Sequence, residues 1–207
     1  MVIRELKPSK RVEGRWLAVL EDGSILRLGE SEVVSFALYA GRELTGEEAD
    51  ALQESALRSG RKEKALSLLA RKPQSRRELG RKLTEWGASE EERDSVCNRL
   101  EELGYLNDGQ YAAQVVRYYS ARGYGERKLR DELYRRGIPR ELWDEALEQA
   151  RDTAEAIDAF VAKKLAGRMP DRQDLKRVSD ALARRGYHWS EINEALRRYG
   201  AEVELDG

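Results

Sequence analysis

The chain has 207 residues, of which 37% are charged and 40% hydrophobic, and its formal net charge is −1. No run of 18 apolar residues is present, which argues against a membrane-spanning helix, and a single cysteine excludes an intrachain disulfide framework. A balanced net charge gives no global attraction for nucleic acid, so any such binding requires a local concentration of cations. We therefore expect a cytoplasmic protein with no membrane association.

Residues 1–40 carry the signals of a small antiparallel sheet. Two apolar runs, 15–20 and 25–28, flank Asp22-Gly23, a dipeptide typical of tight turns between antiparallel strands. A third strand is predicted near Val2.

The next segment predicts two helices. A short helix is expected over residues 32–39, and a longer one begins at the capping box formed by Thr45 and Glu48. The serine and glycine at 59–60 are expected to interrupt this second helix. Residues 1–58 are thus predicted to form an N-terminal extension of a β-hairpin and helix.

Three glycines, Gly87, Gly137 and Gly186, are spaced 50 and 49 residues apart and close the same local pattern. An aliphatic residue lies eight positions before each glycine and a leucine lies four before it, which places both on one face of a helix. The glycine itself can adopt the left-handed conformation that ends a helix. A helical unit repeated at this period predicts a tandem array, which offers long surfaces rather than a single pocket.

The predicted fold is mainly α, with the extension followed by an elongated, curved array of three three-helix repeats. The repeats are predicted to span residues 61–106, 107–151 and 152–207, the last with a short acidic tail over 202–207. Capping and helix-ending signals place helices near 61–71, 75–87 and 89–103, then 108–121, 126–136 and 139–150, and then 153–166, 171–185 and 190–199.

The sequence holds no recognisable catalytic constellation. The single histidine, His188, forms no triad with the single cysteine, Cys97, whose repeat position is typical of a core residue. No Walker-type phosphate loop and no cluster of His and Cys with metal-ligand spacing is present. We therefore predict that the chain is not an enzyme and uses no cofactor or metal. Trp86 and Trp143 are expected to pack between repeats.

Charge is segregated within each repeat. Over residues 61–82 nine cationic side chains accompany two carboxylates, whereas over 83–110 eight carboxylates accompany two cations, and the later repeats alternate likewise. Stacked repeats would align the basic helices into a stripe that matches the phosphates of a polyanion. Alternatively, basic and acidic helices only neutralise each other and keep the surface soluble. The candidate stripe consists of Arg71, Lys72, Arg76, Arg77, Arg81, Lys82, Arg117, Arg122, Arg127, Lys128, Arg130, Arg135, Arg136, Lys176 and Arg177.

Aromatic side chains accompany the cations in the second repeat. Tyr118 and Tyr124 lie beside Arg117 and Arg122, which makes them candidates for stacking on single-stranded bases. Tyr119 occupies a repeat position that predicts a core role instead.

Four segments together carry a family resemblance. They are residues 71–83 (RKPQSRRELGRKL), 103–112 with its Leu-Gly-Tyr-Leu-Asn-Asp start, 123–138 with Gly-Tyr-Gly and Arg-Gly-Ile at its ends, and 182–196. In register over about residues 61–199, they resemble the RecX family, bacterial regulators of the RecA recombinase. The N-terminal hairpin is similar to the extension of longer members.

The resemblance implies a non-enzymatic modulator that binds in the helical groove of the RecA filament on single-stranded DNA. Family members typically inhibit strand exchange, ATP hydrolysis and RecA-stimulated cleavage, and some bind DNA weakly themselves. We expect a monomer. One alternative is a DNA-binding protein of helix-turn-helix type that acts independently of RecA, although its acidic third helices would face phosphates poorly. A second alternative is a protein–protein scaffold.

Overall fold

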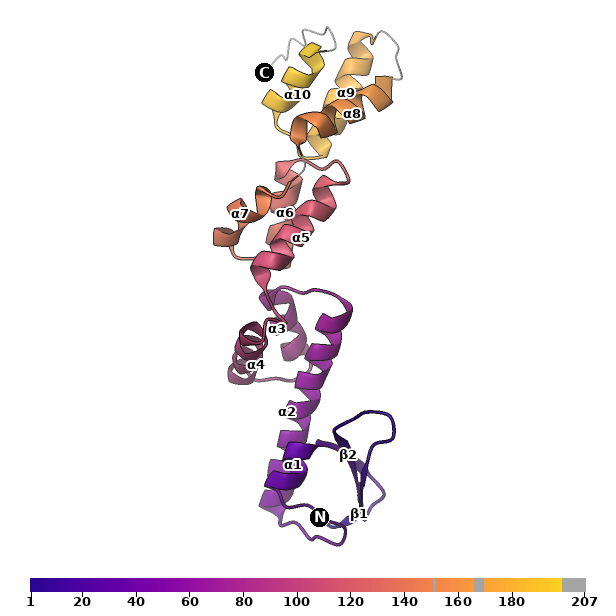
Figure 1. The fold of residues 1–207 in the computed structure, drawn as a ribbon, viewed down its shortest axis with the longest axis vertical. Helices are drawn as coiled ribbons and strands as arrows, with labels where there is room; N and C mark the ends of the chain where they lie inside the picture. The colour runs from indigo at the N-terminus through magenta and orange to yellow at the C-terminus, as the bar shows by residue number, and fades with distance from the viewer. Residues whose placement is uncertain (151, 166–169, 199–207) are drawn as a thin grey trace. The chain divides into compact units, whose positions relative to one another are not determined.

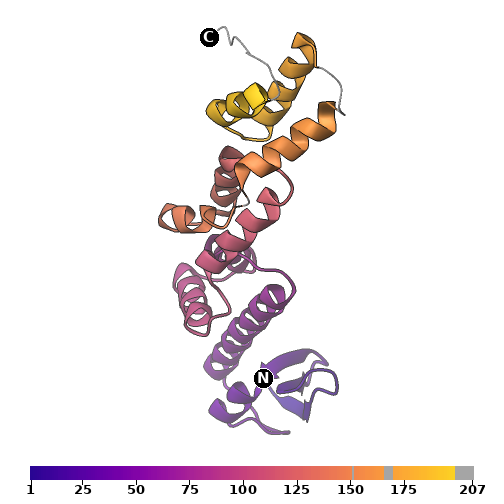
Figure 2. The ribbon, with the colours of Figure 1, turned by 45° about the horizontal axis from the view of Figure 1, so that its top comes forward.

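The computed structural model describes residues 1–150, 152–165 and 170–198 (Figures 1 and 2). It is mainly helical with a small N-terminal sheet, as predicted. The elements are β1 (Ile3–Pro8), β2 (Arg15–Leu20), β3 (Ile25–Gly29), α1 (Glu30–Ser35), α2 (Gly46–Arg71), α3 (Arg76–Glu85), α4 (Glu90–Glu102), α5 (Asp108–Ser120), α6 (Glu126–Arg136), the 3-10 turn η1 (Arg140–Leu142), α7 (Trp143–Leu147), α8 (Thr153–Leu165), α9 (Arg172–Arg184) and α10 (Trp189–Arg198). The predicted acidic tail and the predicted helix ends at 166 and 199 lie outside the described residues.

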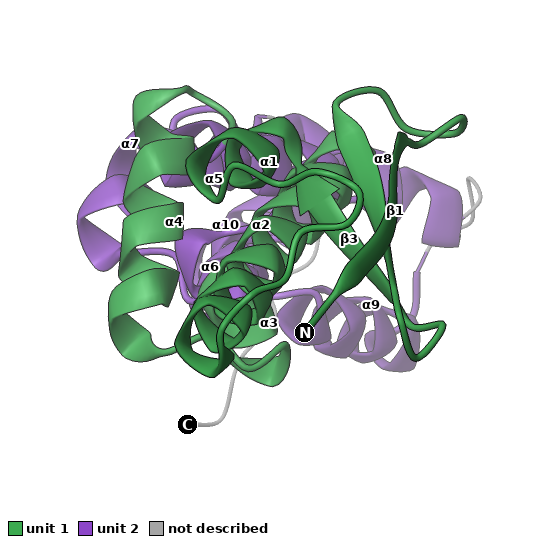
Figure 3. Cartoon of the chain, turned by 90° about the horizontal axis from the view of Figure 1, so that it is seen from below, with its two compact units in different colours: residues 1–73, 79–105 green, residues 74–78, 106–207 purple. Residues whose placement is uncertain are grey.

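The chain divides into two compact units, which Figure 3 colours separately. Unit 1 comprises Met1–Pro73 and Leu79–Tyr105, and unit 2 comprises Gln74–Glu78 and the described chain from Leu106 onward. The first turn of α3 thus belongs with unit 2, where its contacts go to α5 and the end of α6. The predicted borders between repeats stay predictions.

The sheet of unit 1 has the strand order β1-β2-β3, with both pairs antiparallel, so the predicted third strand is confirmed. Its buried face carries Ile3, Ala18 and Leu28, which pack in one cluster with Leu52 of α2. Short-range alternation of apolar and polar residues therefore places the sheet against the helix that follows it. The predicted helix over 32–39 is shorter and earlier, because α1 ends at Ser35.

The predicted interruption at residues 59–60 is wrong, because α2 is one continuous helix of 26 residues. It begins at the predicted capping box, where Thr45 and Glu48 exchange hydrogen bonds of 3.0 and 3.2 Å. A glycine inside a helix costs only about 1 kcal/mol relative to alanine, which packing on either side can outweigh. Ser59 meanwhile donates its hydroxyl to the buried carboxylate of Glu32 at 2.5 Å. The predicted border at 58–61 consequently falls inside α2.

A buried ion pair connects α2 to α4 in unit 1. The Arg61 guanidinium donates from Nε and Nη2 to the two carboxylate oxygens of Glu92, at 2.8 and 2.6 Å, and both side chains are about nine-tenths buried. The burial of Cys97 is confirmed. In this first group of helices Ala65 is buried while Leu66 is 41% exposed, so the aliphatic pattern holds less strictly here than later in the chain.

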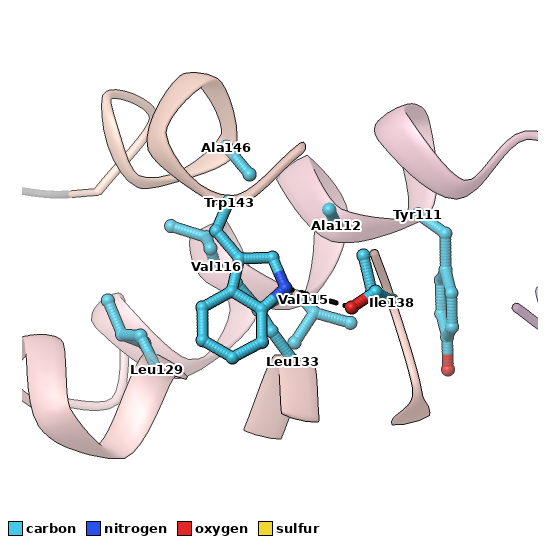
Figure 4. Packing of buried hydrophobic residues seen from close by; sticks show 9 residues of the cluster. All are labelled: Tyr111, Ala112, Val115, Val116, Leu129, Leu133, Ile138, Trp143 and Ala146. Atoms are coloured by element: carbon cyan, nitrogen blue, oxygen red, sulfur yellow. Dashed lines mark hydrogen bonds between the residues drawn. The ribbon is translucent and has the colours of Figure 1, made fainter. Parts of the chain in front are cut away.

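The second group of helices, α5 to α7, has its core around Trp143 (Figure 4). Its indole Nε1 donates to the Ile138 carbonyl at 3.0 Å, and its ring lies with Val116, Leu129 and Leu133. The prediction that Trp143 packs between repeats is therefore wrong, since it fills the core of its own repeat. Likewise Trp86 is half-buried under Lys64 within unit 1.

The third helix of the second group is shorter than predicted. After Pro139 the chain makes the turn η1, and α7 then spans only Trp143–Leu147. The third group buries Ile157 of α8, Leu182 of α9 and Ile192 of α10 in a separate cluster. The mainly α fold and the packing of each group follow from these local patterns.

Candidate functional site

The repeat glycines mark two close contacts inside unit 2, a role that the sequence reasoning missed. Gly137, which follows α6, lies against the Arg77 side chain in the first turn of α3. Beside it the Ser75 hydroxyl donates to the Arg136 carbonyl at 2.5 Å. Ser75 is fully buried by this contact. The C-terminal end of α6 is therefore fastened to the N-terminal end of α3.

The same contact recurs one repeat later. Gly186, which follows α9, lies against Lys128 in the first turn of α6. The Gly125 amide donates to the Arg185 carbonyl at 2.9 Å, and the Arg127 amide donates to the Gly186 carbonyl at 3.1 Å. In both contacts the carbonyls at the end of one helix, α6 or α9, accept hydrogen bonds. The donors lie at the start of the equivalent helix one repeat earlier, α3 or α6 respectively. We call these two contacts the seams.

Three predicted cations occupy one repeat position beside the seams. Arg77, Arg127 and Lys176 each lie ten residues before a repeat glycine, near the start of α3, α6 and α9. All three are exposed, and none forms an ion pair with another described residue. An anionic partner can therefore bind these three cations without displacing an ion pair within the described chain.

Three other predicted cations form ion pairs with Glu132, a buried carboxylate of α6. Lys128, Arg135 and Arg136 lie 2.7, 3.5 and 2.5 Å from its oxygens. Burial alone would raise the pKa of Glu132, but hydrogen bonds from Lys128 and Arg136 lower it from 4.5 to about 2. Burial, the largest single influence, lowers the pKa of Arg136, yet the hydrogen bonds to Glu132, Tyr119 and Tyr111 together outweigh burial and raise this pKa. These three cations therefore contribute to the stability of the fold by pairing with a buried carboxylate.

Several further cations of the predicted stripe pair with neighbouring carboxylates. Arg130 contacts Glu126 at 2.6 Å and Asp144 at 3.4 Å, which links α6 to α7. Further ion pairs join Arg81 and Lys82 to Glu85 and Arg177 to Asp174. At these positions neutralisation within a repeat describes the structure better than a free stripe does.

The basic residues before and at the start of α3 differ in their surroundings. Arg71 donates from Nε to the Ser67 carbonyl at 3.0 Å, and Lys72 is exposed at the end of α2. The Arg76 amide donates to the Asp108 carboxylate at 2.7 Å, which joins the start of α3 to the start of α5. Arg76 therefore marks an anchoring point inside unit 2.

The end of α5 gathers the predicted aromatic residues. The Arg122 guanidinium stacks 3.6 Å from the ring centre of Tyr118, which is 51% exposed. Tyr124 is half-buried, with the Arg185 guanidinium 5.6 Å from its ring centre. Arg117 is exposed nearby on α5. A base could stack on Tyr118 only by sharing or displacing Arg122.

Arg185 is a seam residue that the sequence reasoning missed. Its Nη1 donates to the carbonyls of Arg122 and Gly123, at 3.1 and 3.0 Å. A signal was available, because Arg185 and Arg136 both stand directly before a repeat glycine. This equivalence predicts that both arginines occupy the same position within their repeats. It does not predict which groups their side chains contact.

Two negative findings bear on the kind of site. Within residues 1–150, 152–165 and 170–198, no three His, Cys, Asp or Glu side chains lie close enough to hold a metal ion together. Over the same ranges no helix has both the length and the apolar character needed to cross a membrane.

Comparisons with known proteins agree with the predicted resemblance. The family model for the first three-helix domain of RecX matches residues 62–100, and that for the second matches 107–147. The regulatory protein RecX of Ectopseudomonas mendocina is 38% identical over 135 residues, which cover 64% of this chain and 90% of the relative. That of Pseudomonas putida is 36% identical over 134 residues, covering 64% and 86%.

Two solved structures share the fold. The crystal structure of a regulatory protein RecX matches with a TM-score of 0.72 and 24% identity, covering 95% of this chain and 98% of that one. The crystal structure of RecX from Lactobacillus salivarius matches with a TM-score of 0.65 and 21% identity, covering 70% and 97%. From the sequence relatives and the fold together, we conclude that this chain belongs to the RecX family of regulatory proteins.

Proposed function

We propose that this chain modulates RecA as an inhibitor, by binding in the groove of the RecA filament on single-stranded DNA. Bound there, it would block strand exchange, ATP hydrolysis and RecA-stimulated cleavage by excluding incoming duplex DNA and client proteins. It would act as a cytoplasmic monomer without catalysis of its own. The relatives bear the name regulatory protein, which supports regulation as the general activity.

The observation that carries the proposal is the recurrence of one exposed cation per repeat. Arg77, Arg127 and Lys176 occupy equivalent positions and form no ion pair with a described residue. A filament presents the same surface at regular intervals, so equivalent contacts can be made repeatedly and weak contacts add to a useful avidity. Each cation acts only within about 8–10 Å at cellular salt, so direct contact is required.

The helix-turn-helix alternative finds less support. In unit 1 the third helix, α4, exposes Glu90 and Glu91 in its first turn, where a recognition helix approaches bases and phosphates. In unit 2 the third helix of the second group, α7, has only five residues, and that of the third group, α10, carries Glu191 in its first turn. All three of these helices therefore begin with an acidic first turn, which is unfavourable in a major groove.

A triple charge reversal tests the proposal. In Arg77→Glu, Arg127→Glu, Lys176→Glu, we expect binding to RecA-coated single-stranded DNA to weaken by at least about tenfold, with normal thermal melting. Because Arg77 also packs on Gly137, the double variant without its substitution is measured in parallel. The matched control reverses three exposed cations of the N-terminal extension, Arg4, Lys10 and Arg11.

Fluorescence polarisation on RecA-coated single strands, bare single strands and duplex DNA, at two salt concentrations, separates the alternatives. Wild-type filament binding by the folded triple variant would overturn the proposed surface. Tight duplex binding without RecA would favour the helix-turn-helix alternative instead.

A further inference from the structure

Unit 1 contains a pocket of about 890 Å³ between strand β3 and helix α2. All of β3, Ile25–Gly29, contributes to one wall. The other wall is formed by α2, and five of its lining residues recur at alternating intervals of four and three, which places those five on one face of the helix. These five are Gln53, Leu57, Gly60, Lys64 and Ser67. Other residues of α2, Trp86 and the β1–β2 loop also line the pocket.

Strand β3 is an edge strand of the sheet, so one side of its backbone is open. The Leu20 amide donates to the Ser24 carbonyl at 2.8 Å, and the register then pairs Ala18 with Leu26. Because hydrogen-bonded and non-hydrogen-bonded pairs alternate in an antiparallel ladder, the N–H and C=O groups of Ile25 and Arg27 point away from β2. Unpaired backbone groups of this kind are a template for a further strand.

The walls of the pocket combine apolar surface with available positive charge. Ile25 and Leu57 are 56% and 57% exposed although both are large and apolar. Arg27 and Lys64 are also exposed, and in the described part of the chain neither forms an ion pair. Lys64 lies over the Trp86 ring, with Nζ 5.7 Å from its centre. An occupant with both acidic and apolar side chains would match these walls.

The α2 wall also carries several small side chains, which leave space beside the helix. Its small residues are Ala56, Ser59, Gly60 and Ser67, and a Cβ added at Gly60 would meet no atom within 4 Å. The other lining cations are already engaged, Arg15 by Glu63 and Arg61 by Glu92. The unengaged positive charge therefore belongs to Arg27, on the strand, and Lys64, on the helix, while the β1–β2 loop adds the exposed carboxylate of Glu13.

We propose that this groove binds an extended acidic peptide segment of a protein partner, which adds to β3 as a fourth strand. Main-chain hydrogen bonds to Ile25 and Arg27 would supply affinity that depends little on sequence. Acidic side chains would then meet Arg27 and Lys64, and an apolar side chain would contact Leu57. The groove lies in unit 1, whereas the three repeated cations of the filament proposal lie in unit 2. The two proposals therefore stand separately.

The test is an NMR titration of the full-length chain labelled with ¹⁵N. The probe is a blocked synthetic heptapeptide that alternates glutamate with valine or phenylalanine. One comparison peptide carries lysine in place of glutamate, and another carries N-methyl groups on alternate backbone nitrogens, which prevent strand pairing. We expect the acidic peptide to shift resonances of residues 24–29 and of the α2 wall, and both comparison peptides to bind at least about tenfold more weakly.

Two substitutions locate the site. Gly60→Phe fills the groove and is expected to reduce peptide binding at least about tenfold, while Gly60→Ala leaves room and is expected to bind as the wild type does. Arg27→Glu should weaken binding similarly, whereas Arg4→Glu, on the opposite edge strand, should not. Gly60→Phe and Arg27→Glu should both leave filament binding unchanged. Failure of the groove proposal is therefore distinguishable from failure of the filament proposal.

Three results would each overturn the groove proposal. They are wild-type peptide binding by folded Gly60→Phe and Arg27→Glu variants, equal binding of the N-methylated peptide, and peptide-induced shifts confined to unit 2. Tighter binding of a single-stranded oligonucleotide at the same residues would also overturn it, by assigning the groove to nucleic acid. If Gly60→Phe does not fold, Arg27→Glu and the N-methylated peptide still decide the question.

Discussion

Gly186, directly after α9, lies against the backbone of Lys128 in the first turn of α6, so that a Cβ at Gly186 would fall 2.5 Å from the Lys128 amide nitrogen. Gly186 also has a φ of +90°, a conformation that side chains disfavour. Gly137 repeats both features one repeat earlier, where its neighbour is the Arg77 side chain. Glycine is needed here for its backbone conformation and for the contact.

Gly186→Ala is therefore expected to lower the free energy of unfolding by about 3 kcal/mol, from a left-handed backbone plus a contact that backbone atoms cannot relieve. Urea denaturation followed by circular dichroism measures the loss. Gly104→Ala is the matched control, because Gly104 has a φ of +74° but open space around it, and we expect only about 1 kcal/mol there. Equal losses in the two variants would contradict the seam as a close contact.

The carboxylate of Glu132 predicts a pH dependence of stability. Its pKa in the folded chain, about 2, lies below the ordinary value of 4.5. Its contribution is therefore fully present above about pH 4.5 and is lost as pH falls towards 2. We expect Glu132→Gln to lower the free energy of unfolding at pH 7 by about 3 kcal/mol and to flatten the dependence between pH 4.5 and 2.

Chemical denaturation at a series of pH values checks this expectation. Glu126→Gln serves as the control, since its partner Arg130 and Glu126 itself are both more than 40% exposed, and exposed pairs are worth less than about 1 kcal/mol. An unchanged acid dependence in Glu132→Gln would show that the three cations around this carboxylate do not hold it ionised.

The ion pair between Arg61 and Glu92 predicts a large effect of one substitution. Arg61→Ala leaves the buried Glu92 carboxylate without its main partner, which typically costs about 3–5 kcal/mol. Arg99→Ala removes an exposed pair with Glu102 and should cost less than about 1 kcal/mol. Thermal melting of both variants distinguishes them, and similar melting temperatures would argue against a tie between α2 and α4.

Gly60 predicts a gain rather than a loss. It lies inside α2 with no atom within 4 Å of an added Cβ, so Gly60→Ala should raise the free energy of unfolding by about 1 kcal/mol. Differential scanning calorimetry measures the change. A destabilised Gly60→Ala variant would indicate that α2 is in fact broken at residues 59–60, as the sequence alone suggested.

Local signals were sufficient to predict much of the fold. The predicted helix over 126–136 matches α6, because a glycine in the left-handed conformation ends it, and the capping box at Thr45 forms as expected. The continuity of α2 was not predictable in this way. It depends on packing on both sides of Gly60, notably the anchoring of Arg61 by Glu92, and these residues lie 31 positions apart.

The candidate site was predictable only in part. Counting charges along the chain found the cations, but the count could not separate Arg127, which is exposed, from Arg136, which hydrogen-bonds to Glu132. That distinction depends on which way each side chain leaves its helix and on the burial of a carboxylate between them. The seams were likewise hidden, since they join residues about 60 positions apart in the sequence.

Because α2 is unbroken, its residues that pack on the N-terminal sheet and its residues that contact α4 are fixed in rotation about one helix axis. Each residue added within this helix would rotate one end against the other by about 100°. One inserted residue would therefore turn the face that packs on the sheet away from the face that carries Arg61 towards α4. Insertions of about seven residues would restore the alignment, whereas a flexible linker would tolerate any length.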